Sequence, residues 1–583
     1  MIRTRARCAW GGLVAATALV AGGFVAAPAA MAATATANAK AAGAAAAATP
    51  RTVIADTASH NPLLSYVLPR EQDPQPDSTA LSALCQSYAG DTHVYNSIAP
   101  NVDAINGDTV VNVGSQTGCY SAQNETTVAV NPQNPRNLVA GSNDYRVFNS
   151  REGRNDSSGW AYTSFDGGRT WKNVELPGLT YQTGATGALS DMDSAGDPVL
   201  AFGPHNTVYY TNIVFSRLNA GSGIAVSVSH DGGLTWGAPS VVQLDGVLPD
   251  GTATPTNYFN DKNWISVDPR TGKVYVTWTR FTYDSAGNYV ESPIVVKTSD
   301  NQGRSWSDAY RISPTTTNFS GGLTAFAQGS NPQVTADGTV YVAYEGTVCA
   351  TLACNGASDH DATVIAYSRD HGKTWTNEQV GQNYDFPYNP DVANDTLTGE
   401  NFRINSYPQL TVDPLTQHLY VTWADDRNGQ YDSTGASVKT DGTAFIAGSA
   451  DGRNWSPVAA AEPGGDVVFP AVAAFGGKVA VTYYTRSYDP SGIDLDYAYT
   501  TIGWNGRTSS QHRITTQSAN PQVQFVGTGL VSGTVLQGEF IGDYSAAVIG
   551  WDGMLHPVWT DFRGHPGVDT PHQTVDTQAI PIW

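Results

Sequence analysis

Charged residues are scarce in this chain of 583 residues, and basic residues are the scarcer kind. Lys and Arg number 31 against 52 Asp and Glu, which gives a formal net charge of −21. A chain this acidic lacks the positive surface that phosphate backbones and anionic lipids attract. We therefore expect neither nucleic acid nor an anionic membrane surface as a partner.

Several motifs with a known chemistry are missing. The chain has no His-Glu-x-x-His, no Gly-x-Ser-x-Gly, no glycine-rich phosphate loop and no Cys-x-x-Cys. These absences exclude the corresponding proteases, esterases and nucleotide enzymes. Acids such as Asp191, Asp193 and Asp197 do not follow the spacing of a defined calcium loop. Asp359-His360-Asp361 could contact a metal, but we interpret it as a solvated loop, so no metal or other cofactor is expected.

Long apolar runs are missing after the first 32 residues. Arg3, Arg5 and Arg7 precede an apolar stretch that ends in Ala30-Met31-Ala32, which is the pattern of a secretory signal peptide with its cleavage site. Residues 33–80 are rich in Ala, Thr and Pro and read as a linker without a packed core. We expect residues 81–583 to fold as the functional domain of a secreted, extracellular monomer without a membrane span.

Cysteine is also rare, with five residues in the whole chain. Four of them remain after the predicted signal, and they fall into a pair at Cys85 and Cys119 and a closer pair at Cys349 and Cys354. An even number in an exported chain predicts two disulfides. A zinc site is a poor alternative, because one Cys-x4-Cys loop cannot supply four ligands.

One phrase recurs along the chain. It reads Ser-Phe-Asp-Gly-Gly-Arg-Thr-Trp at residues 164–171 and returns at 229–236, 299–306, 368–375 and 449–455, with the acid at Asp300 in the third copy and a faint sixth copy at 503–508. The pattern predicts a tight hairpin in which Asp accepts backbone hydrogen bonds, Gly adopts positive φ and Trp packs beneath. Such residues fasten a turn and carry no chemistry.

Each copy lies in a longer unit of short strands rich in Val, Thr and Tyr, which is the organisation of propellers and solenoids. In the unit that contains residues 331–375, strands are predicted at 332–336, 339–344 and 362–367. The first strand of the unit recurs seven times, near Thr126, Pro198, Asn263, Pro332, Pro408, Pro470 and Tyr544. We predict an all-β propeller of seven four-stranded blades, with six as the alternative, closed by an N-terminal strand near 109–114.

The repeated phrase is an Asp box (BNR repeat), and with these strands the chain resembles the sialidase (neuraminidase) superfamily. The resemblance implies a site where the first strands begin, with a nucleophilic tyrosine, a glutamate as its base, an aspartic acid and three arginines that bind the sugar carboxylate. Tyr544 matches the tyrosine, Glu539 could be its base, and Asp156 lies where the acid is expected. The alternatives are an aromatic plug for Tyr544 and a solvated loop residue for Asp156.

Four arginines follow the second strand of their units at matching places: Arg280, Arg427, Arg486 and Arg563. Repetition places them on one face, where guanidinium groups suit an anionic sugar. The alternative is that Arg427 pairs with Asp425 or Asp426 and Arg563 pairs with Asp561, as salt bridges that lock the blades.

The sialidase motif Phe-Arg-Ile-Pro is absent from the first unit, where Asn124-Glu125-Thr126-Thr127 stands, and only Phe402-Arg-Ile-Asn405 resembles it. The sequence therefore supports a carbohydrate-acting propeller with three open possibilities. These are an exo-acting glycoside hydrolase of the sialidase type, a non-catalytic propeller that binds glycan or cell wall, and a uronate lyase with Tyr544 as proton donor. Whether the protein is an enzyme stays open at this point, with a glycoside hydrolase favoured.

Overall fold

The structure is a computed structural model that describes most of the chain between residues 99 and 582. The described ranges are 99–105, 121–152, 154–287, 289–314, 326–348, 360–433, 437–456, 458–461, 465–503, 508–525, 527–564 and 571–582. The predicted signal peptide, the predicted linker, the predicted closing strand at 109–114 and all five cysteines lie outside these ranges.

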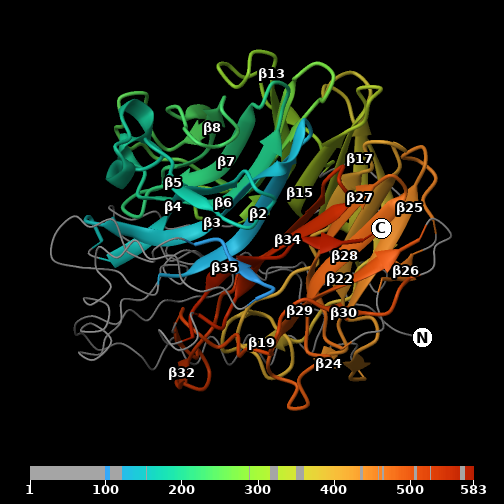
Figure 1. The fold of residues 1–583 in the computed structure, drawn as a ribbon. Coiled ribbons are helices and arrows are strands. Elements are labelled where there is room, and N and C mark those ends of the chain that lie inside the picture. The colour runs from blue at the N-terminus through green and yellow to red at the C-terminus, as the bar shows by residue number, and fades with distance from the viewer. Residues whose placement is uncertain are drawn as a thin grey trace.

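Seven antiparallel sheets, each built on four strands, surround one axis, which confirms the predicted propeller (Figure 1). Blade 1 contains β2 (Gln123–Asn131), β3 (Asn134–Asn149), β4 (Arg154–Ser164) and β5 (Lys172–Glu175). Blade 2 contains β6 (Ser194–Phe202), β7 (Val208–Phe215), β8 (Ser222–Ser229) and β9 (Ser240–Asp245). Blade 3 contains β10 (Tyr258–Val267), β11 (Val274–Tyr283), β13 (Ile294–Ser299) and β14 (Tyr310–Arg311), with β12 (Tyr289–Glu291) beside β11.

The remaining blades repeat this order. Blade 4 contains β15 (Ala327–Val334), β16 (Val340–Val348), β17 (His360–Ser368) and β18 (Thr376–Gln382). Blade 5 contains β21 (Gln409–Val412), β22 (Leu419–Asp425), β25 (Thr443–Ser449) and β26 (Ala459–Ala460). Blade 6 contains β27 (Val468–Phe475), β28 (Lys478–Thr485), β29 (Asp496–Ile502) and β30 (His512–Arg513). Blade 7 contains β33 (Ala546–Ile549), β34 (Met554–Asp561) and β35 (Thr574–Thr577), with β36 (Ile580–Pro581) beside β34.

The outer strand of blade 7 comes from the other end of the described chain. β1 (Val102–Asp103) pairs antiparallel with β35, so that Val102 lies opposite Thr577. In Figure 1 this blue strand lies beside the red strands of blade 7. The ring is therefore closed by a strand from the N-terminal side, which removes the open sheet edge that blade 7 would otherwise present.

The first strand of every blade is the innermost one. These strands pack against each other in the order β2, β6, β10, β15, β21, β27, β33 and back to β2. Among the described residues the only helices are the short 3-10 turns η1 (Tyr181–Thr183) and η2 (Gly187–Asp191). No helix in the part of the chain that the structure describes is long and apolar enough to cross a membrane.

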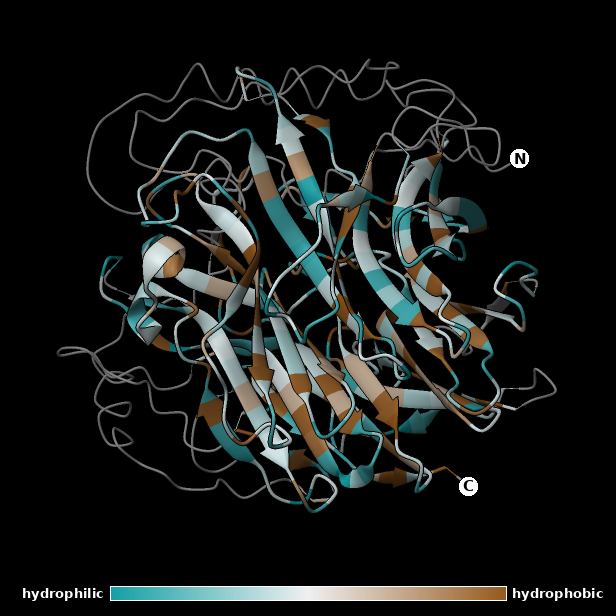
Figure 2. Ribbon diagram, turned by 90° about the horizontal axis from the view of Figure 1, so that it is seen from above, coloured by the Kyte–Doolittle hydropathy of each residue, from teal (hydrophilic) through white to brown (hydrophobic). Residues whose placement is uncertain are grey.

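The hydrophobic core is divided into layers between neighbouring blades. Val199 and Ile224 of blade 2 pack with Val274 and Trp278 of blade 3, for example, and comparable clusters lie between the other adjacent pairs. Figure 2 shows the corresponding hydrophobic residues (brown) concentrated along the strands. Strands such as β7 and β16 are buried along their whole length, and their sequences read as nearly continuous apolar runs, whereas outer strands such as β9 are partly exposed.

The Asp boxes form the expected turns between the third and fourth strands. In blade 1, Asp166 accepts hydrogen bonds from the backbone N–H groups of Arg169 and Thr170, both at 3.0 Å, and from the Thr170 hydroxyl at 2.7 Å. In blade 3 this place belongs to Asn301, which accepts from the Ser305 N–H at 2.9 Å. Asp300 had been expected to be the box acid, but it precedes that position and instead accepts from Lys273 Nζ at 2.9 Å.

The opposite face carries the longer connections and is called the loop face here. It bears three two-stranded hairpins, which are β19 (Tyr388–Asn389) with β20 (Asn394–Asp395), β23 (Gln430–Tyr431) with β24 (Ser437–Lys439), and β31 (Gly527–Thr528) with β32 (Val535–Leu536). All three connect either a fourth strand to the next blade or a second strand to a third. The loop face is therefore the face where the inner strands begin and where the predicted site residues were placed.

Candidate functional site

A bulge near the start of several inner strands directs polar side chains to the axis. The strand register shifts between Asn124 and Thr127, between Gly196 and Val199, and between Asp261 and Trp264. The residues within these bulges are Glu125, Asp197 and Lys262, with φ of 54°, 50° and 48°. Non-glycine residues adopt this left-handed backbone region only where the surrounding structure enforces it. Three blades thereby contribute one charged residue each to the same point.

Lys262 is the centre of the resulting ion cluster. Its Nζ lies 3.1 Å from Glu125 Oε1, 3.0 Å from Asp197 Oδ2 and 2.6 Å from Asp543 Oδ2. Asp543 also binds Arg403 through two hydrogen bonds, from Nε at 2.9 Å and from Nη2 at 2.7 Å. Residues of blades 1, 2 and 3 and of the segments preceding blades 5 and 7 therefore meet at the axis.

The pKa shifts in this cluster describe its charge. Burial, followed by the negative charge of Asp197, raises the pKa of Glu125 well above its usual value. Burial would also raise the pKa of Asp543, but Arg403 and Lys262 outweigh it and hold this pKa well below its usual value. The two cations thereby offset the charge of the carboxyl groups around them, and burial disfavours the charged form of Glu125. Neutralisation of this kind is what permits so many ionisable groups to be buried together.

Tyr544 packs beside this cluster. Its hydroxyl donates to the Pro198 carbonyl at 3.1 Å, its ring meets Trp264 edge-on at 5.4 Å, and 7% of the residue is exposed. Burial first, and then the charges of Glu125 and Asp197, raise the pKa of Tyr544 well above 10. Glu539 is buried, and its backbone carbonyl accepts from Arg403 N–H at 3.3 Å. These contacts are those of a buried aromatic side chain that fills space, which is the alternative interpretation of Tyr544. Its role as a nucleophile stays a prediction.

Asp156 lies on β4 and is 1% exposed. Arg217 holds it through two hydrogen bonds, from Nη2 to Oδ1 at 2.7 Å and from Nε to Oδ2 at 3.0 Å, and Ser194 donates to it at 2.9 Å. Burial acts to raise the pKa of Asp156, but Arg217 and the hydrogen bonds outweigh it, so the pKa is lowered. A carboxyl group that stays ionised is a poor proton donor, which weighs against Asp156 as a general acid.

The arginines at the ends of the second strands are all paired with carboxylates. Six blades carry such an arginine, including Arg146 and Arg217, which the sequence analysis did not single out. The pairs are Arg146–Asp144 at 2.6 Å, Arg217–Asp156 at 2.7 Å, Arg280–Asp245 at 2.7 Å, Arg427–Asp425 at 2.5 Å, Arg486–Glu400 at 2.9 Å and Arg563–Asp561 at 2.7 Å. For Arg427 and Arg563 this is the salt bridge considered as the alternative to sugar binding.

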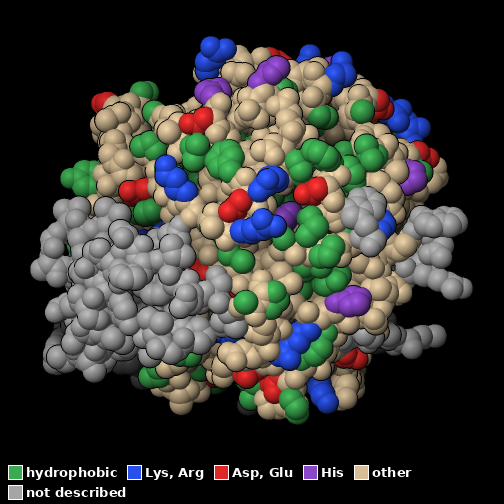
Figure 3. Space-filling view, in the orientation of Figure 1, with side chains coloured by type: hydrophobic (Ala, Val, Ile, Leu, Met, Phe, Trp, Pro, Cys, Tyr) green, Lys and Arg blue, Asp and Glu red, His purple; other side chains and the backbone are tan. Residues whose placement is uncertain are grey.

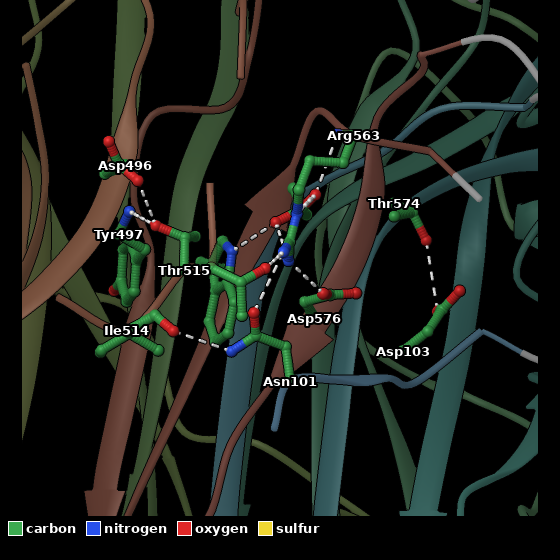
Figure 4. A network of polar contacts seen from close by, with 12 residues as sticks. Asn101, Asp103, Asp496, Tyr497, Ile514, Thr515, Arg563, Thr574 and Asp576 are labelled. Carbon is green, nitrogen blue, oxygen red and sulfur yellow. Dashed lines mark hydrogen bonds and ion pairs between the residues drawn. The ribbon is translucent and has the colours of Figure 1, made fainter. Parts of the chain in front are cut away.

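Arg563 shows how complete this pairing is (Figure 4). Its Nη2 lies 2.7 Å from Asp561 Oδ2 and 2.8 Å from Asp576 Oδ2, and its Nη1 donates to Asn101 Oδ1 at 3.1 Å. Asn101 in turn donates to the Ile514 carbonyl at 3.0 Å. The Arg563 side chain is 1% exposed. It therefore connects blade 7, the end of blade 6 and the segment that contains β1.

Blade 4 has no arginine at the end of its second strand, where Glu345, Gly346 and Thr347 stand. Glu345 is 4% exposed, accepts a hydrogen bond from Asn383 Nδ2 at 3.4 Å and lies on β16 opposite Thr363 of β17, the strand that also carries Asp361 two residues earlier. Burial raises the pKa of Glu345 to about 7. The pKa of Asp361 is also raised well above its usual value, by burial first and then by the charges of Asp385, Glu345 and Asp395.

These four acids, Glu345, Asp361, Asp385 and Asp395, are called the blade-4 carboxyl cluster. Glu345 and Asp361 are buried, whereas Asp385 and Asp395 are partly exposed on the loop face. The cluster lies close to the axis and to the ion cluster around Lys262. Tyr407 is near both, because the charges of Glu345, Lys262 and Asp543 all act on its pKa. Sequence reasoning missed Glu345. The signal that could have found it is the acid that ends the second strand of blade 4, where the other blades place arginine.

Other candidates add little. His360 lies 3.1 Å from Gln379 through Nε2, and no group of three or more His, Cys, Asp or Glu residues in the described ranges is arranged to hold a metal ion. On the face shown in Figure 3, acidic and basic side chains are interspersed. Among the groups of ionisable side chains described above, the blade-4 carboxyl cluster is the one whose own blade supplies no arginine.

One family model matches the repeat of this chain, and several solved structures are distantly similar to it. The family model "BNR/Asp-box repeat" matches residues 366–377, and no curated protein matches the chain. The chain is similar in structure to a protein of unknown function from Dyadobacter fermentans DSM 18053, with 11% identity over 66% of this chain and 94% of that one and a TM-score of 0.39.

Two sialidases give similar values. Hadza microbial sialidase Hz136 is 15% identical over 76% of this chain and 73% of its own, with a TM-score of 0.37. The intramolecular trans-sialidase from Ruminococcus gnavus is 12% identical over 67% of this chain and 95% of its own, with a TM-score of 0.39. The chain is a seven-bladed β-propeller that carries BNR/Asp-box repeats.

Proposed function

We propose that this protein is a glycoside hydrolase whose reacting groups are in the blade-4 carboxyl cluster. The observation that carries the proposal is the pair of buried acids, Glu345 and Asp361, whose pKa values are both raised and whose blade lacks the arginine that neutralises the acids elsewhere. Hydrolysis of a glycosidic bond needs one protonated carboxyl group and one carboxylate on either side of that bond. Groups with displaced pKa values are typical of such sites.

The roles follow from the protonation states. Glu345, with its pKa at about 7, is protonated in mildly acidic solution and would donate its proton to the leaving oxygen. Asp361 and Asp385 share a hydrogen bond, which requires a proton on one of the two carboxyl groups and leaves the other as a carboxylate. That carboxylate would activate water or attack the sugar. Asp385 and Asp395, being partly exposed, connect the buried acids with solvent.

The sialidase-type mechanism is the second candidate, and it stays a prediction. It assigns Tyr544 as nucleophile, Glu539 as base, Asp156 as acid, and Arg280, Arg427, Arg486 and Arg563 as the groups that bind an anionic sugar. Its support is the fold and the position of Tyr544 at the start of β33. The salt bridges of the four arginines weigh against this mechanism, because a sugar carboxylate would have to displace a protein carboxylate from each arginine. A uronate lyase would need the same free arginines, and a non-catalytic glycan-binding propeller needs none of them.

Turnover assays on a panel of fluorogenic glycosides test the proposal. We expect Glu345→Gln and Asp361→Asn each to lower kcat by at least about 100-fold, which is the usual contribution of a general acid or base. Asp308→Asn, at an exposed acid distant in sequence from the cluster, should retain full activity. The wild-type rate should fall as the pH rises through about 7, because Glu345 then loses the proton it donates.

Tyr544→Phe separates the two mechanisms. Under the proposed mechanism this variant keeps nearly all of its turnover, since Tyr544 only fills space and donates to the Pro198 carbonyl. A loss of orders of magnitude in Tyr544→Phe, together with an active Glu345→Gln, would establish the sialidase-type mechanism in its place. Calorimetric binding of a glycan without any turnover would instead identify a binding propeller.

A further inference from the structure

The charges around the blade-4 carboxyl cluster narrow the class of ligand. We infer that this site takes a glycan without carboxylate, sulfate or phosphate groups, so its sugars are neutral or carry an amine. The inference rests on the proposed function, and it goes beyond that proposal by excluding the anionic sugars that a sialidase-like fold suggests. Three independent observations support it.

The first observation is that the cations near the axis are already occupied. Lys262 lies within 3.1 Å of three carboxyl groups, and Arg403 binds Asp543 with both nitrogens of its fork. Arg427, the arginine of the adjacent blade 5, binds Asp425 and also donates to the Gln382 carbonyl at 2.9 Å. An anionic ligand would gain a cation here only by taking it from a protein carboxylate. That carboxylate would then be buried without a partner, which costs several kcal/mol.

The second observation concerns what the cluster itself offers to a ligand. The largest influences on the pKa of Asp361, which are burial and three neighbouring acids, all raise it. Asp361 is 4% exposed and shares a hydrogen bond with the Asp385 carboxyl group, and its buried Oδ1 accepts from no N–H group or neutral hydroxyl among the described residues. Such an oxygen needs a donor. A sugar hydroxyl or an ammonium group can donate to it, whereas a ligand carboxylate can only bring another negative charge.

The third observation is the set of aromatic side chains at the same edge of the loop face. Tyr384 directly precedes Asp385, the hydroxyl of Tyr431 lies 3.5 Å from the Asp385 carbonyl, and Tyr388 is 40% exposed on the β19–β20 hairpin. Partly exposed tyrosines give large, rigid contact surfaces with a polar end. Together with carboxyl acceptors they suit the apolar faces and outward hydroxyl groups of an uncharged sugar ring.

Calorimetry with matched pairs of oligosaccharides tests the inference. Each pair shares a backbone and differs in charge, as in lactose against sialyllactose and methyl-esterified against free oligogalacturonate. Neutral xylo-, arabino- and chito-oligosaccharides and amine-bearing chitosan oligomers complete the panel. We expect a neutral or amine-bearing member to bind, and the anionic member of each pair to bind at least about tenfold more weakly, because a like charge nearby costs on the order of 1–2 kcal/mol.

A charge-neutralised variant sharpens the test. At a pH above about 7, where Glu345 is ionised, Glu345→Gln/Asp361→Asn should shrink the difference between the members of a pair, while Asp308→Asn should leave it unchanged. Tighter binding of the anionic members by the wild type would overturn the inference and leave the proposed hydrolase intact. Failure of every oligosaccharide to bind or to be hydrolysed would overturn the proposed function as well, so the two failures are distinguishable.

Discussion

Lys262 is a single residue on which three blades and the segment before blade 7 depend. It is buried and contacts Glu125, Asp197 and Asp543, so its loss would leave carboxyl groups at the axis without their cation. We expect Lys262→Met to lower the free energy of unfolding by about 3–5 kcal/mol, as is usual when one partner of a buried ion pair is removed. Urea denaturation measures this change.

Two further substitutions control for that experiment. Lys273→Met removes an ion pair with Asp300, which is 78% exposed, and should cost less than about 1 kcal/mol. Glu125→Gln keeps the size of the side chain and should cost less than Lys262→Met, because burial raises the pKa of Glu125 and so already disfavours its charged form. Equal losses in Lys262→Met and Lys273→Met would contradict the description of a tightly coupled axial cluster.

His556 adds a pH dependence of its own. It lies on β34, is 1% exposed, and neither ring nitrogen has a hydrogen-bond partner among the described residues. Burial lowers its pKa to about 4, with the charge of Asp552 acting in the opposite direction. The folded protein therefore holds His556 neutral, and the unfolded chain binds a proton below about pH 6.5.

Because the folded pKa is the lower one, this residue costs no stability above about pH 6.5 and costs more and more as the pH falls towards 4. We expect His556→Leu to reduce the loss of unfolding free energy between pH 6.5 and 4 by up to about 3 kcal/mol. Melting temperatures measured across this pH range follow the change. His230→Leu, at an exposed Asp-box position, is the matched control. Identical pH profiles for the wild type and His556→Leu would show that His556 does not titrate in this way.

At the scale of elements, the Asp boxes are not equivalent. Asp166 accepts from two backbone N–H groups and two hydroxyls, whereas Asn301 of blade 3 accepts from one N–H and one hydroxyl and donates to a second hydroxyl. We expect Asp166→Ala to cost about 1 kcal/mol, like the loss of a helix cap, and Asn301→Ala to cost clearly less, because a neutral acceptor makes weaker hydrogen bonds. Thermal unfolding of both variants measures the difference. Glycan affinity should be unchanged in both, since the boxes lie opposite the loop face.

Local chemistry explains why the blades could be predicted and the site could not. The turn around Asp166 and the apolar run of β16 depend on residues that are adjacent in sequence, so a single copy of the repeat defines a blade. Three of the arginines, such as Arg427 with Asp425, pair with an acid two residues away, and such pairs are visible in the sequence. The other three partners are distant in sequence: Arg217 reaches Asp156 in blade 1, for example, and Arg486 reaches Glu400 ahead of blade 5. Repetition indicated that the arginines share a face, but only the packed ring shows that each one already holds a carboxylate.

At the scale of the whole molecule, closure depends on a few residues near the start of the described chain. β1 supplies the outer strand of blade 7, and Asn101 connects Arg563 with Ile514. A chain that begins at residue 106 lacks both contacts, and we expect its melting temperature to fall by several degrees and blade 7 to become sensitive to protease. A chain that begins at residue 99 keeps both contacts and, like the shorter chain, lacks Cys85, which makes it the matched control. Equal melting temperatures for the two truncated chains would show that β1 contributes nothing to closure.

The pairing of Val102 with Thr577 also has a consequence for biosynthesis. A ribosome or an export channel releases the chain from its N-terminal end, so β1 emerges first and must wait for nearly the entire remainder before its partner strand exists. Contacts of such long sequence separation form slowly. During that interval six blades can assemble in order, each on the one before, while the last interface stays open and exposes an unpaired strand edge. Until the final strand arrives, the nascent protein therefore keeps an unpaired edge at the open interface, which is the kind of surface that aggregates and that a holding chaperone covers.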